Sequence, residues 1–462
     1  MTTRDDVLDR AADHARKYLE GLAGRPVRAL ASSADLRKRL DVPHEHATPA
    51  ATVLDILAEA ALVGTTASRG PRYFGFVTGG SLPVATAADW LVSAWDQNAA
   101  VHVLSPFAAA VEEVASAWLR GIVGLTPAWS VGFVTGCQMA NFTALASARH
   151  HVLAASGWDV EARGLFGAPP VDVVVSDESH YTIFNALKLL GLGASRVRRI
   201  PTDGQGRMCA GDLQAALAGG RGPCIVCAQA GNVNTGAFDP IDEIADAARS
   251  RGAWLHVDGA FGLWASVSPA LRHLVAGVSR ADSIATDGHK WLNVPYDCGI
   301  VFTAHPASHR AAMTLDAAYI ITDGVERDSR DFAPEESRRA RAVPVYAALA
   351  TLGREGLRDL VERCCHLARR MADQLGADPR VRVLNDVVLN QVLVRFDGPG
   401  GTDAFTRAVI AAVQADGTCW LGGTTWHHMA AMRISVSNWS TTDDDIDRSA
   451  RAILRAVAEA AR

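Results

Sequence analysis

Two stretches of the chain decide the interpretation of its fold: Trp254-Leu-His-Val-Asp-Gly-Ala260 and Ser283-Ile-Ala-Thr-Asp-Gly-His-Lys-Trp291. Each begins with a largely apolar run that is typical of a buried strand and then turns abruptly to glycine and charged residues. In open α/β sheets, ligands bind beyond the carboxyl ends of the strands. Asp258 and Lys290, which end and follow the two runs, are therefore predicted to lie at the ligand-binding edge of a sheet.

The sequence around these stretches alternates between short apolar runs and amphipathic segments, from about residue 130 to residue 305. The predicted strands are 131–135, 171–176, 196–200, 224–229, 254–258, 283–286 and 299–303. The predicted helices between them are 140–154, 182–190, 210–218 and 241–250. Near-continuous apolar strands that alternate with helices predict an α/β fold, with a mostly parallel sheet covered on both faces.

The two ends of the chain are predicted to differ from this region. Residues 1–72 form an N-terminal helical segment, with one helix capped by Thr48 and with Pro49 in its first turn. Residues 73–346 form the large domain, and residues 347–462 form a small C-terminal α+β domain. The polar segment 322–341, rich in Asp, Glu and Arg, is predicted to be a mobile surface loop.

Composition excludes several classes of function. The 462 residues carry a net charge of −5, which gives no indication of a nucleic-acid partner. The chain has no apolar run of about 18 residues and no apolar segment near its start, so neither a membrane span nor a signal peptide is expected. Cys224 and Cys227 lie in an apolar run that fits a buried strand better than a redox or zinc site. We therefore expect a cytoplasmic protein with no bound metal.

Residues with candidate chemical roles follow the two opening strands. Lys290, next to His289, is either a reactive lysine at the mouth of the sheet or an ordinary surface lysine on a loop. Asp258, followed by the small residues Gly259 and Ala260, either faces a cationic ring nitrogen or caps the next helix. Neither motif decides between its two interpretations by itself.

Two further turns have the same placement. Val134-Thr-Gly-Cys-Gln-Met-Ala-Asn141 predicts a strand, a turn at Gly136 and a helix whose first N–H groups, at Cys137 and Gln138, hold an anion. His180 follows another strand, where its ring can stack on a planar cofactor. Taken singly, the first is an ordinary turn and the second a structural histidine. Together the four sites occur in the order phosphate cradle, aromatic stack, ring-nitrogen acid and imine lysine, which favours a cofactor site.

This ordered set resembles the group II pyridoxal-phosphate-dependent decarboxylases, which include the aromatic amino acid, glutamate and aspartate decarboxylases. The resemblance covers nearly the whole chain and is most specific at the His-Val-Asp and Asp-x-His-Lys-Trp patterns. Its other parts are Pro71-Arg-Tyr-Phe-Gly-Phe76, Leu104-Ser-Pro106, Asn234-Thr-Gly-Ala-Phe-Asp-Pro240 and Arg433-Ile-Ser-Val-Ser-Asn-Trp439. It implies the type I fold of aspartate aminotransferase, pyridoxal 5′-phosphate as cofactor, and a homodimer with the active site near the subunit interface.

The resemblance also implies roles for matching residues. Lys290 would form the Schiff base, Asp258 would keep the ring nitrogen protonated, and His180 would stack on the ring; these three are the expected catalytic residues. Decarboxylation of an L-amino acid would then proceed through an external aldimine and a quinonoid. The residues implied in cofactor binding are Gly136, Cys137, Gln138, His180, Asn234, Asp258, Ala260, His289 and Lys290.

The substrate is less well defined by the sequence. Phe76, His102 and Trp426 are candidate lining residues, whereas Trp95 is interpreted as packed in the core. No arginine stands out as a clamp for an acidic side chain. An aromatic or hydrophobic amino acid is therefore mildly preferred.

One departure from the family pattern concerns the loop 322–341, which contains no tyrosine. Aromatic amino acid decarboxylases carry a tyrosine there that reprotonates Cα, and by register its place falls near Ser329. The nearest tyrosine, Tyr319, precedes the loop. Since loss of this tyrosine accompanies aldehyde formation in the family, aldehyde synthesis, aldolase-type cleavage or a tailoring reaction remain alternatives. A non-catalytic cofactor-binding protein is the third interpretation.

Overall fold

The computed structural model describes residues 4–42, 45–314 and 326–462. Its contacts divide the chain into two compact units, each considered by itself. The large unit contains residues 79–369 and 384–392, and the terminal unit contains residues up to 78 together with 370–383 and 393–462. The domains 1–72, 73–346 and 347–462 stay a prediction, because each of the two compact units combines segments that are separate in the sequence.

A mostly parallel sheet forms the centre of the large unit, as the sequence predicts. Within the described residues it has seven strands in the order β1-β7-β6-β5-β4-β2-β3, and only β7 runs antiparallel to its neighbours. The strands are β1 (Ser130–Val134), β2 (Asp172–Ser176), β3 (Arg198–Ile200), β4 (Cys224–Gln229), β5 (Trp254–Asp258), β6 (Ser283–Asp287) and β7 (Gly299–Thr303). In the β6–β7 ladder Asp287 stands opposite Gly299, so residues 288–298 connect two adjacent strands.

Helices accompany this sheet along the chain. They are α4 (Pro83–Trp95), α5 (Pro106–Val123), α6 (Cys137–Ala154), α7 (Val160–Arg163), α8 (Tyr181–Leu189), α9 (Ala210–Leu217), α10 (Ile241–Arg251), α11 (Pro306–Met313) and α12 (Ala342–Gly376), which is kinked at Gly353 and ends in the terminal unit. Single helical turns are η1 (Ala194–Arg196), η2 (Gly262–Val267), η3 (Arg272–Val275), η4 (Val278–Arg280) and η5 (Ser329–Phe332). No helix in the described part of the chain is both long enough and apolar enough to span a bilayer.

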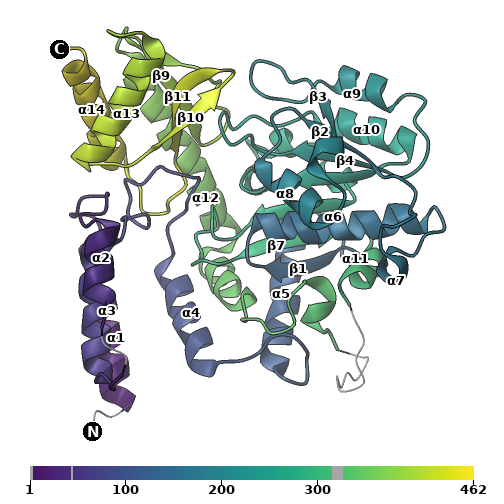
Figure 1. Ribbon diagram of the computed structural model, residues 1–462, viewed down its shortest axis with the longest axis horizontal. Helices are drawn as coiled ribbons and strands as arrows, with labels where there is room; N and C mark the ends of the chain where they lie inside the picture. Colours follow the sequence, from purple (N-terminus) through teal and green to yellow (C-terminus); the bar gives the residue numbers. More distant parts are fainter. Residues whose placement is uncertain (1–3, 43–44, 315–325) are drawn as a thin grey trace. The chain divides into compact units, whose positions relative to one another are not determined.

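Helices α6 and α8 lie across one face of the sheet (Figure 1). Leu145 of α6 and Ile183 of α8 share a buried apolar cluster with Val173 of β2 and with Ile225 and Cys227 of β4. Residues two apart along a strand point to the same face, which is why Ile225 and Cys227 both enter this cluster. Burial of each large aliphatic side chain stabilises the fold by roughly 1.5–3 kcal/mol. This core fixes the start of α6 at the carboxyl edge of the sheet.

The terminal unit combines N-terminal helices with a small sheet. Its described elements are α1 (Arg4–Glu20), α2 (Ser33–Leu40), α3 (Ala50–Gly64), β8 (Val381–Val383), β9 (Gln391–Phe396), α13 (Thr402–Asp416), β10 (Gly422–Trp426), β11 (Met429–Ser435) and α14 (Asp443–Ala460). The strand order is β10-β11-β9-β8. Helices α1 and α3 are packed together, and Arg10 pairs with Asp55 between them. The predicted cap at Thr48 is wrong, because Pro49 precedes α3 without a side-chain cap.

The described part of segment 322–341, residues 326–341, is not a mobile surface loop. Arg330, Asp331 and Arg338 are buried. The Arg338 Nη2 lies 3.1 Å from Glu112 Oε1 of α5, and both side chains are fully buried. The charged residues of this segment predicted a solvated loop, but Arg338 is buried with its partner from α5 inside the large unit. Removing one partner of such a buried pair typically costs about 3–5 kcal/mol of stability.

Two buried histidines predict sensitivity of the fold to acid. Burial lowers the pKa of His256 in β5 to about 4 and that of His309 in α11 to about 3. Since both values lie below the unfolded value near 6.5, the unfolded chain binds more protons at intermediate pH, and stability falls as pH decreases from about 6.5 toward 4. We expect the free energy of unfolding to fall by roughly 2 kcal/mol per histidine between pH 6.5 and 5.

Thermal unfolding measured across this pH range tests the expectation. His309→Asn should flatten the dependence of the midpoint on pH, whereas replacement of the exposed His46 by Asn should leave it unchanged. An equal slope in the wild type and His309→Asn would contradict the assignment.

Candidate active site

Lys290 lies just beyond the end of β6, in the connection to β7. Its side chain is 18% exposed, and its Nζ lies 3.1 Å from Asp287 Oδ2. The Nζ also lies 5.9 Å from the centre of the Phe261 ring. Burial lowers the pKa of Lys290, but the negative charges of Asp287 and Asp258 and the hydrogen bond to Asp287 act in the opposite direction, so the pKa is raised overall. The structure therefore holds this lysine as an ammonium group that is paired with a carboxylate.

Three donors converge on the carboxylate of Asp287. The backbone N–H of Cys137, at the start of α6, donates to its Oδ1 at 2.6 Å. The His289 Nε2 lies 3.3 Å from the same oxygen, and the Lys290 Nζ pairs with the other oxygen. A helix N-terminal N–H and an imidazole N–H are donors of the kind that bind a phosphate monoester, so Cys137 and His289 fit the phosphate of the implied cofactor, with the Lys290 amine left for the covalent link. In this structure the Asp287 carboxylate, which sequence reasoning did not single out, accepts from all three groups.

His289 is oriented by the backbone. Its Nδ1 accepts the N–H of Cys298 at 3.1 Å, so the ring proton is on Nε2, which faces Asp287. Burial lowers the pKa of His289, although the Asp287 carboxylate opposes the effect. The ring of Tyr296 packs against His289, with centres 4.3 Å apart and the ring planes tilted by 31°. A neutral His289 is therefore a hydrogen-bond donor with a fixed direction.

Glycines allow the backbones around Lys290 to approach closely. A Cβ on Gly299 would lie 2.3 Å from the carbonyl carbon of Gly136, so the β6–β7 connection meets the β1–α6 turn directly. Gly136 precedes α6, and a Cβ there would approach the His289 ring to 3.1 Å. Space thus requires glycine at 299, whereas at 136 a Cβ would only press against the His289 ring.

Asp258, the last residue of β5, is buried and surrounded by donors. Its Oδ2 accepts from Asn141 Nδ2 at 3.0 Å, and its Oδ1 accepts from the N–H of Ala260 at 3.1 Å. The Cys137 thiol lies 3.4 Å from Oδ1. Burial and then the charge of Asp258 raise the pKa of Cys137 well above its ordinary value, so the thiol keeps its proton and donates. The carboxylate is held in one orientation, as a group that faces a ring nitrogen must be.

His180 lies at the start of α8, where its side chain is half-buried. Its Nδ1 lies 2.8 Å from Thr182 Oγ1, and its backbone N–H donates to Gln229 Oε1 at 3.2 Å. Thr182 also accepts from Asn141 at 3.3 Å, and Asn141 in turn bonds Asp258. Hydrogen bonds and ion pairs therefore join the predicted residues Cys137, His180, Asp258, Ala260, His289 and Lys290 into one group.

The remaining predicted residues have less direct connections. Gln138 is half-buried in the first turn of α6. Asn234 is buried in the turn after β4, where its backbone N–H donates to Asn232 Oδ1 at 2.8 Å. His102 donates its backbone N–H to Asp328 Oδ1 at 2.8 Å. Their roles toward a cofactor or substrate stay predictions.

Phe76 and Trp426 belong to the terminal unit. The ring of Phe76 is 64% exposed and stacks on Trp420 with centres 5.5 Å apart. Trp426 is 3% exposed and stacks on His427 at 4.2 Å. Of the two, only Phe76 presents its side chain at a surface of its unit.

Ser329 is buried and is not placed as an exposed proton donor would be. Its Oγ donates to Glu112 Oε2 at 2.6 Å. The place that the register gives to the family's loop tyrosine is therefore close to a buried serine that is bonded to α5. Tyr319 and residues 322–325 lie outside the described residues.

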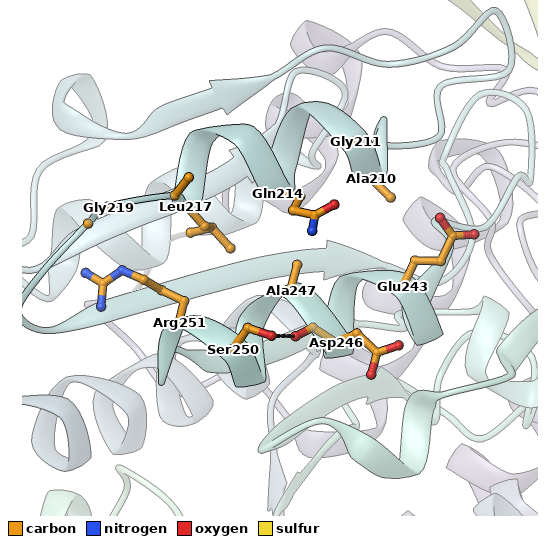
Figure 2. Close-up of a pocket in the computed structure, with 12 residues that line it drawn as sticks. Ala210, Gly211, Gln214, Leu217, Gly219, Glu243, Asp246, Ala247, Ser250 and Arg251 are labelled. Carbon is orange, nitrogen blue, oxygen red and sulfur yellow. Dashed lines mark hydrogen bonds between the residues drawn. The ribbon is translucent and has the colours of Figure 1, made fainter.

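A surface groove of about 640 Å³ lies elsewhere on the large unit, between α9 and α10 (Figure 2). Gln214 and Leu217 of α9 face Ala247 and Arg251 of α10 across it. No predicted site residue lines this groove. The group around Lys290 is thus defined by its hydrogen bonds and ion pairs.

Gly79 provides a direct test of the packing behind Lys290. A Cβ there would lie 1.8 Å from the carbonyl oxygen of Lys290, and the next residue, Gly80, donates its N–H to Asn293 Oδ1 at 2.6 Å. We expect Gly79→Ala to displace the lysine segment, lower stability by about 1–3 kcal/mol and reduce bound cofactor. Gly211→Ala, where nothing lies within 4 Å, is the matched control and should change neither the thermal midpoint nor cofactor content. Equal behaviour of the two variants would contradict the close approach.

Comparison with known proteins places these residues in a wider context. A family model described as the pyridoxal-dependent decarboxylase conserved domain matches residues 37–397. The chain is 27% identical over 451 residues to an aromatic-L-amino-acid decarboxylase of Bacillus atrophaeus, covering 94% of this chain and 92% of that protein. It is 25% identical over 458 residues to a 4-hydroxyphenylacetaldehyde synthase of Rhodiola rosea, covering 96% and 92%.

Relatives with acidic substrates match a shorter part of the chain. An acidic amino acid decarboxylase of Mus musculus is 31% identical over 317 residues, which cover 66% of this chain and 56% of that protein. Among solved structures, Oryza sativa TDC with PLP and tryptamine superposes with a TM-score of 0.93 at 24% identity, covering 100% of this chain and 99% of the other. At that identity the likeness shows the fold, which confirms the predicted type I architecture.

Proposed function

The chain belongs to the pyridoxal-dependent decarboxylase family, and from this membership we propose that it removes CO2 from an L-amino acid with an aromatic or hydrophobic side chain. The family makes it a carboxy-lyase that uses pyridoxal 5′-phosphate. The observation that carries the proposal is the connected group around Lys290. It combines a partly buried lysine, an anion-binding pair of N–H donors and an oriented carboxylate.

Each member of the group has a distinct proposed role. When bound, the cofactor supplies a protonated ring that accepts the electron pair left at Cα as CO2 departs. Lys290 would hold the cofactor covalently through its amine, for which the ammonium group paired with Asp287 must first give up its proton. Asp258 holds the proton at the ring nitrogen through its fixed carboxylate. Cys137 and His289 bind the phosphate through N–H groups that already point to one place.

His180 is proposed to lie against the ring and to orient the substrate carboxylate. Its Nδ1 is engaged with Thr182, and donation by the Thr182 hydroxyl would place the ring proton on Nε2. By holding the substrate carboxylate in one orientation, His180 would select the bond between Cα and the carboxylate for cleavage. Orientation by His180 would therefore favour decarboxylation over the other reactions at Cα.

The preference for an aromatic or hydrophobic substrate rests on two observations. The relative that matches most of the chain at 27% identity acts on aromatic L-amino acids, whereas the acidic decarboxylase matches a shorter part. Within the lysine group, the exposed ring of Tyr296 packs against His289 beside Lys290. An aromatic surface next to the reacting lysine favours a flat apolar side chain.

A homodimer is also proposed, on the basis of an exposed apolar face formed by α4, α5 and their connection. Trp95, predicted to be packed in the core, is instead 43% exposed and meets Phe107 edge-on at 5.1 Å. The contact between Trp95 and Phe107 joins exposed apolar side chains of the two helices, and exposed apolar patches are typical of protein interfaces. The exposed members are Trp90, Leu91, Trp95, Val103, Leu104, Phe107, Val114 and Trp118. Sedimentation equilibrium should give twice the 49.0 kDa chain mass.

A reducing compartment such as the cytoplasm is proposed for the protein. All eight cysteines are unpaired, and seven of them are buried. Buried thiols with raised pKa values, such as Cys227 and Cys298, are suited to an environment that does not form disulfides.

Aldehyde synthesis is the second candidate function, supported by the relative from Rhodiola rosea and by the buried Ser329. A decarboxylase must return a proton to Cα, and two tyrosines are candidates for this step. Tyr296 packs against His289, and Tyr319 lies outside the described residues. Tyr296→Phe and Tyr319→Phe separate them, because removal of the donor should increase aldehyde at the expense of amine.

Product analysis tests the proposal as a whole. The cofactor-loaded protein is incubated with a panel of amino acids, and CO2, amine, aldehyde and peroxide are measured separately. Decarboxylation predicts equal amounts of CO2 and amine from an aromatic or hydrophobic substrate. Aldehyde with peroxide and ammonia would replace the proposal by the second function. A cofactor spectrum that responds to no amino acid would favour a non-catalytic cofactor-binding protein.

A further inference from the structure

A buried chain of hydrogen bonds lies behind Asp258. Trp254 Nε1 donates to Ser283 Oγ at 2.8 Å, and Ser283 Oγ lies 2.9 Å from His256 Nδ1. His256 Nε2 lies 2.9 Å from Asn141 Oδ1, and Asn141 Nδ2 donates to Asp258 Oδ2 at 3.0 Å. Each of these side chains is at most 4% exposed. The chain therefore runs from the base of β5 to the carboxylate at its end, away from water.

The chemistry of its two ends fixes the direction of the chain. The Trp254 indole only donates, so it occupies a lone pair of Ser283 and leaves that hydroxyl proton for His256 Nδ1. The proton of His256 is then on Nε2 and is donated to Asn141 Oδ1. At the other end the Asp258 carboxylate only accepts, so Asn141 must turn its N–H groups toward it. The carboxylate end requires this arrangement and the tryptophan end is compatible with it, and the low pKa of His256 is in keeping with a neutral ring.

Asn141 is also a branch point. The second N–H of its amide donates to Thr182 Oγ1 at 3.3 Å, and that hydroxyl lies 2.8 Å from His180 Nδ1. Because Thr182 accepts from Asn141, its own proton is free to be donated to His180 Nδ1. The proton of His180 is then on Nε2, on the opposite side of the imidazole. One amide thus connects the group that faces the ring nitrogen with the group that stacks on the ring.

We propose that Asn141 is a positioning residue that sets the orientation of Asp258 and the tautomer of His180 together. The inference rests on the proposed function for the roles of these two groups, but the arrangement of protons is a property of the cofactor-free protein. Asn141 lies four residues after Cys137 on α6, so both are on the same face of the helix. A single helix thereby carries the phosphate-binding N–H and the amide that aligns the two groups around the ring.

Three variants isolate the parts of the network. Thr182→Val keeps the size of the side chain and removes only the branch to His180. Asn141→Ala removes both N–H donors and the acceptor of His256. Thr143→Val is the matched control, since Thr143 is fully buried on the same helix but donates only to the carbonyl of Met139, at 2.8 Å. If Asn141→Ala does not fold, Thr182→Val still tests the His180 branch.

Nitrogen NMR of the histidine rings in the cofactor-free protein is the main measurement, with signals assigned from His180 and His256 variants. In the wild type and Thr143→Val, both rings should be neutral with the proton on Nε2. Thr182→Val should change the tautomer of His180 alone, and Asn141→Ala should change His180 and remove the hydrogen-bonded shift of His256. An Nδ1-protonated His180 in the wild type, or a His180 signal unaffected by both variants, would overturn the proposal.

Kinetics of the cofactor-loaded enzyme provide a second readout. Asn141→Ala should lower kcat about tenfold, the loss expected for one buried hydrogen bond, with KM little changed. A raised KM at constant kcat would contradict a positioning role. If the proposed function is wrong, the wild-type enzyme will release no CO2. The NMR result on the cofactor-free protein does not depend on that outcome.

Discussion

Lys290→Ala is expected to yield a folded protein that has lost both covalently bound cofactor and turnover. The chain has only four lysines, and Lys290 is the one whose Nζ is placed among Asp287, Phe261 and the start of α6. No neighbouring amine can replace it, so kcat should fall on the order of 10⁴-fold or more, as for other covalent nucleophiles. The visible absorbance band of the bound cofactor should disappear with the activity.

The control for this experiment is Lys188→Ala. Lys188 is exposed in the last turn of α8, and its removal should leave spectrum and turnover unchanged. Borohydride reduction followed by mass analysis of peptides gives a direct measurement, since the cofactor should be fixed to Lys290 in the wild type. Turnover that persists in Lys290→Ala, or a label on another lysine, would reject the assignment.

Asp258→Asn is the second substitution with a large expected effect. Asparagine has nearly the same shape, and its oxygen can still accept from Asn141 or from the N–H of Ala260. The negative charge is lost, however, so the ring nitrogen is no longer held protonated and Cα carries more of the charge that develops as CO2 leaves. We expect kcat to fall on the order of 10²–10³-fold, the typical cost of removing one preorganised electrostatic group.

Retained cofactor distinguishes this loss from misfolding. Asp258→Asn should keep Lys290 and the phosphate donors intact, so cofactor content should stay close to that of the wild type while kcat falls. Asp177→Asn is the matched control, because Asp177 follows the parallel strand β2 at the same edge of the sheet but is exposed. A similar kcat for Asp258→Asn and the wild type would show that this carboxylate does not serve the ring nitrogen.

The strands were the most predictable part of the fold. The predicted bounds 224–229, 254–258 and 299–303 coincide with β4, β5 and β7, since strands buried on both faces are continuous apolar runs. Strand β10 was not predicted, because Gly422 and Gly423 have no side chains to carry an alternating pattern. Helix α4 was also missed, as it begins at Pro83 directly after a stretch rich in glycine.

Some residues of the candidate site could be predicted from the sequence and others could not. Lys290, Asp258 and His180 could be found because each closes or follows an apolar strand, where polar residues are conspicuous. Asn141 could not, because its role depends on His256, a partner far away in the sequence. The burial of Arg338 was equally hidden: its partner Glu112 comes from α5, and charge in a sequence is normally a sign of exposure.

The ladder pair between Asp287 and Gly299 has a consequence for how this protein can vary. Because β7 returns beside β6, the eleven residues from 288 to 298 leave and re-enter the sheet at one place. Substitutions inside this closed segment can reshape the surroundings of the reactive amine while the register of every strand stays the same. The segment is therefore an exchangeable cassette, and grafting it between relatives is a practical route to altered specificity on an unchanged scaffold.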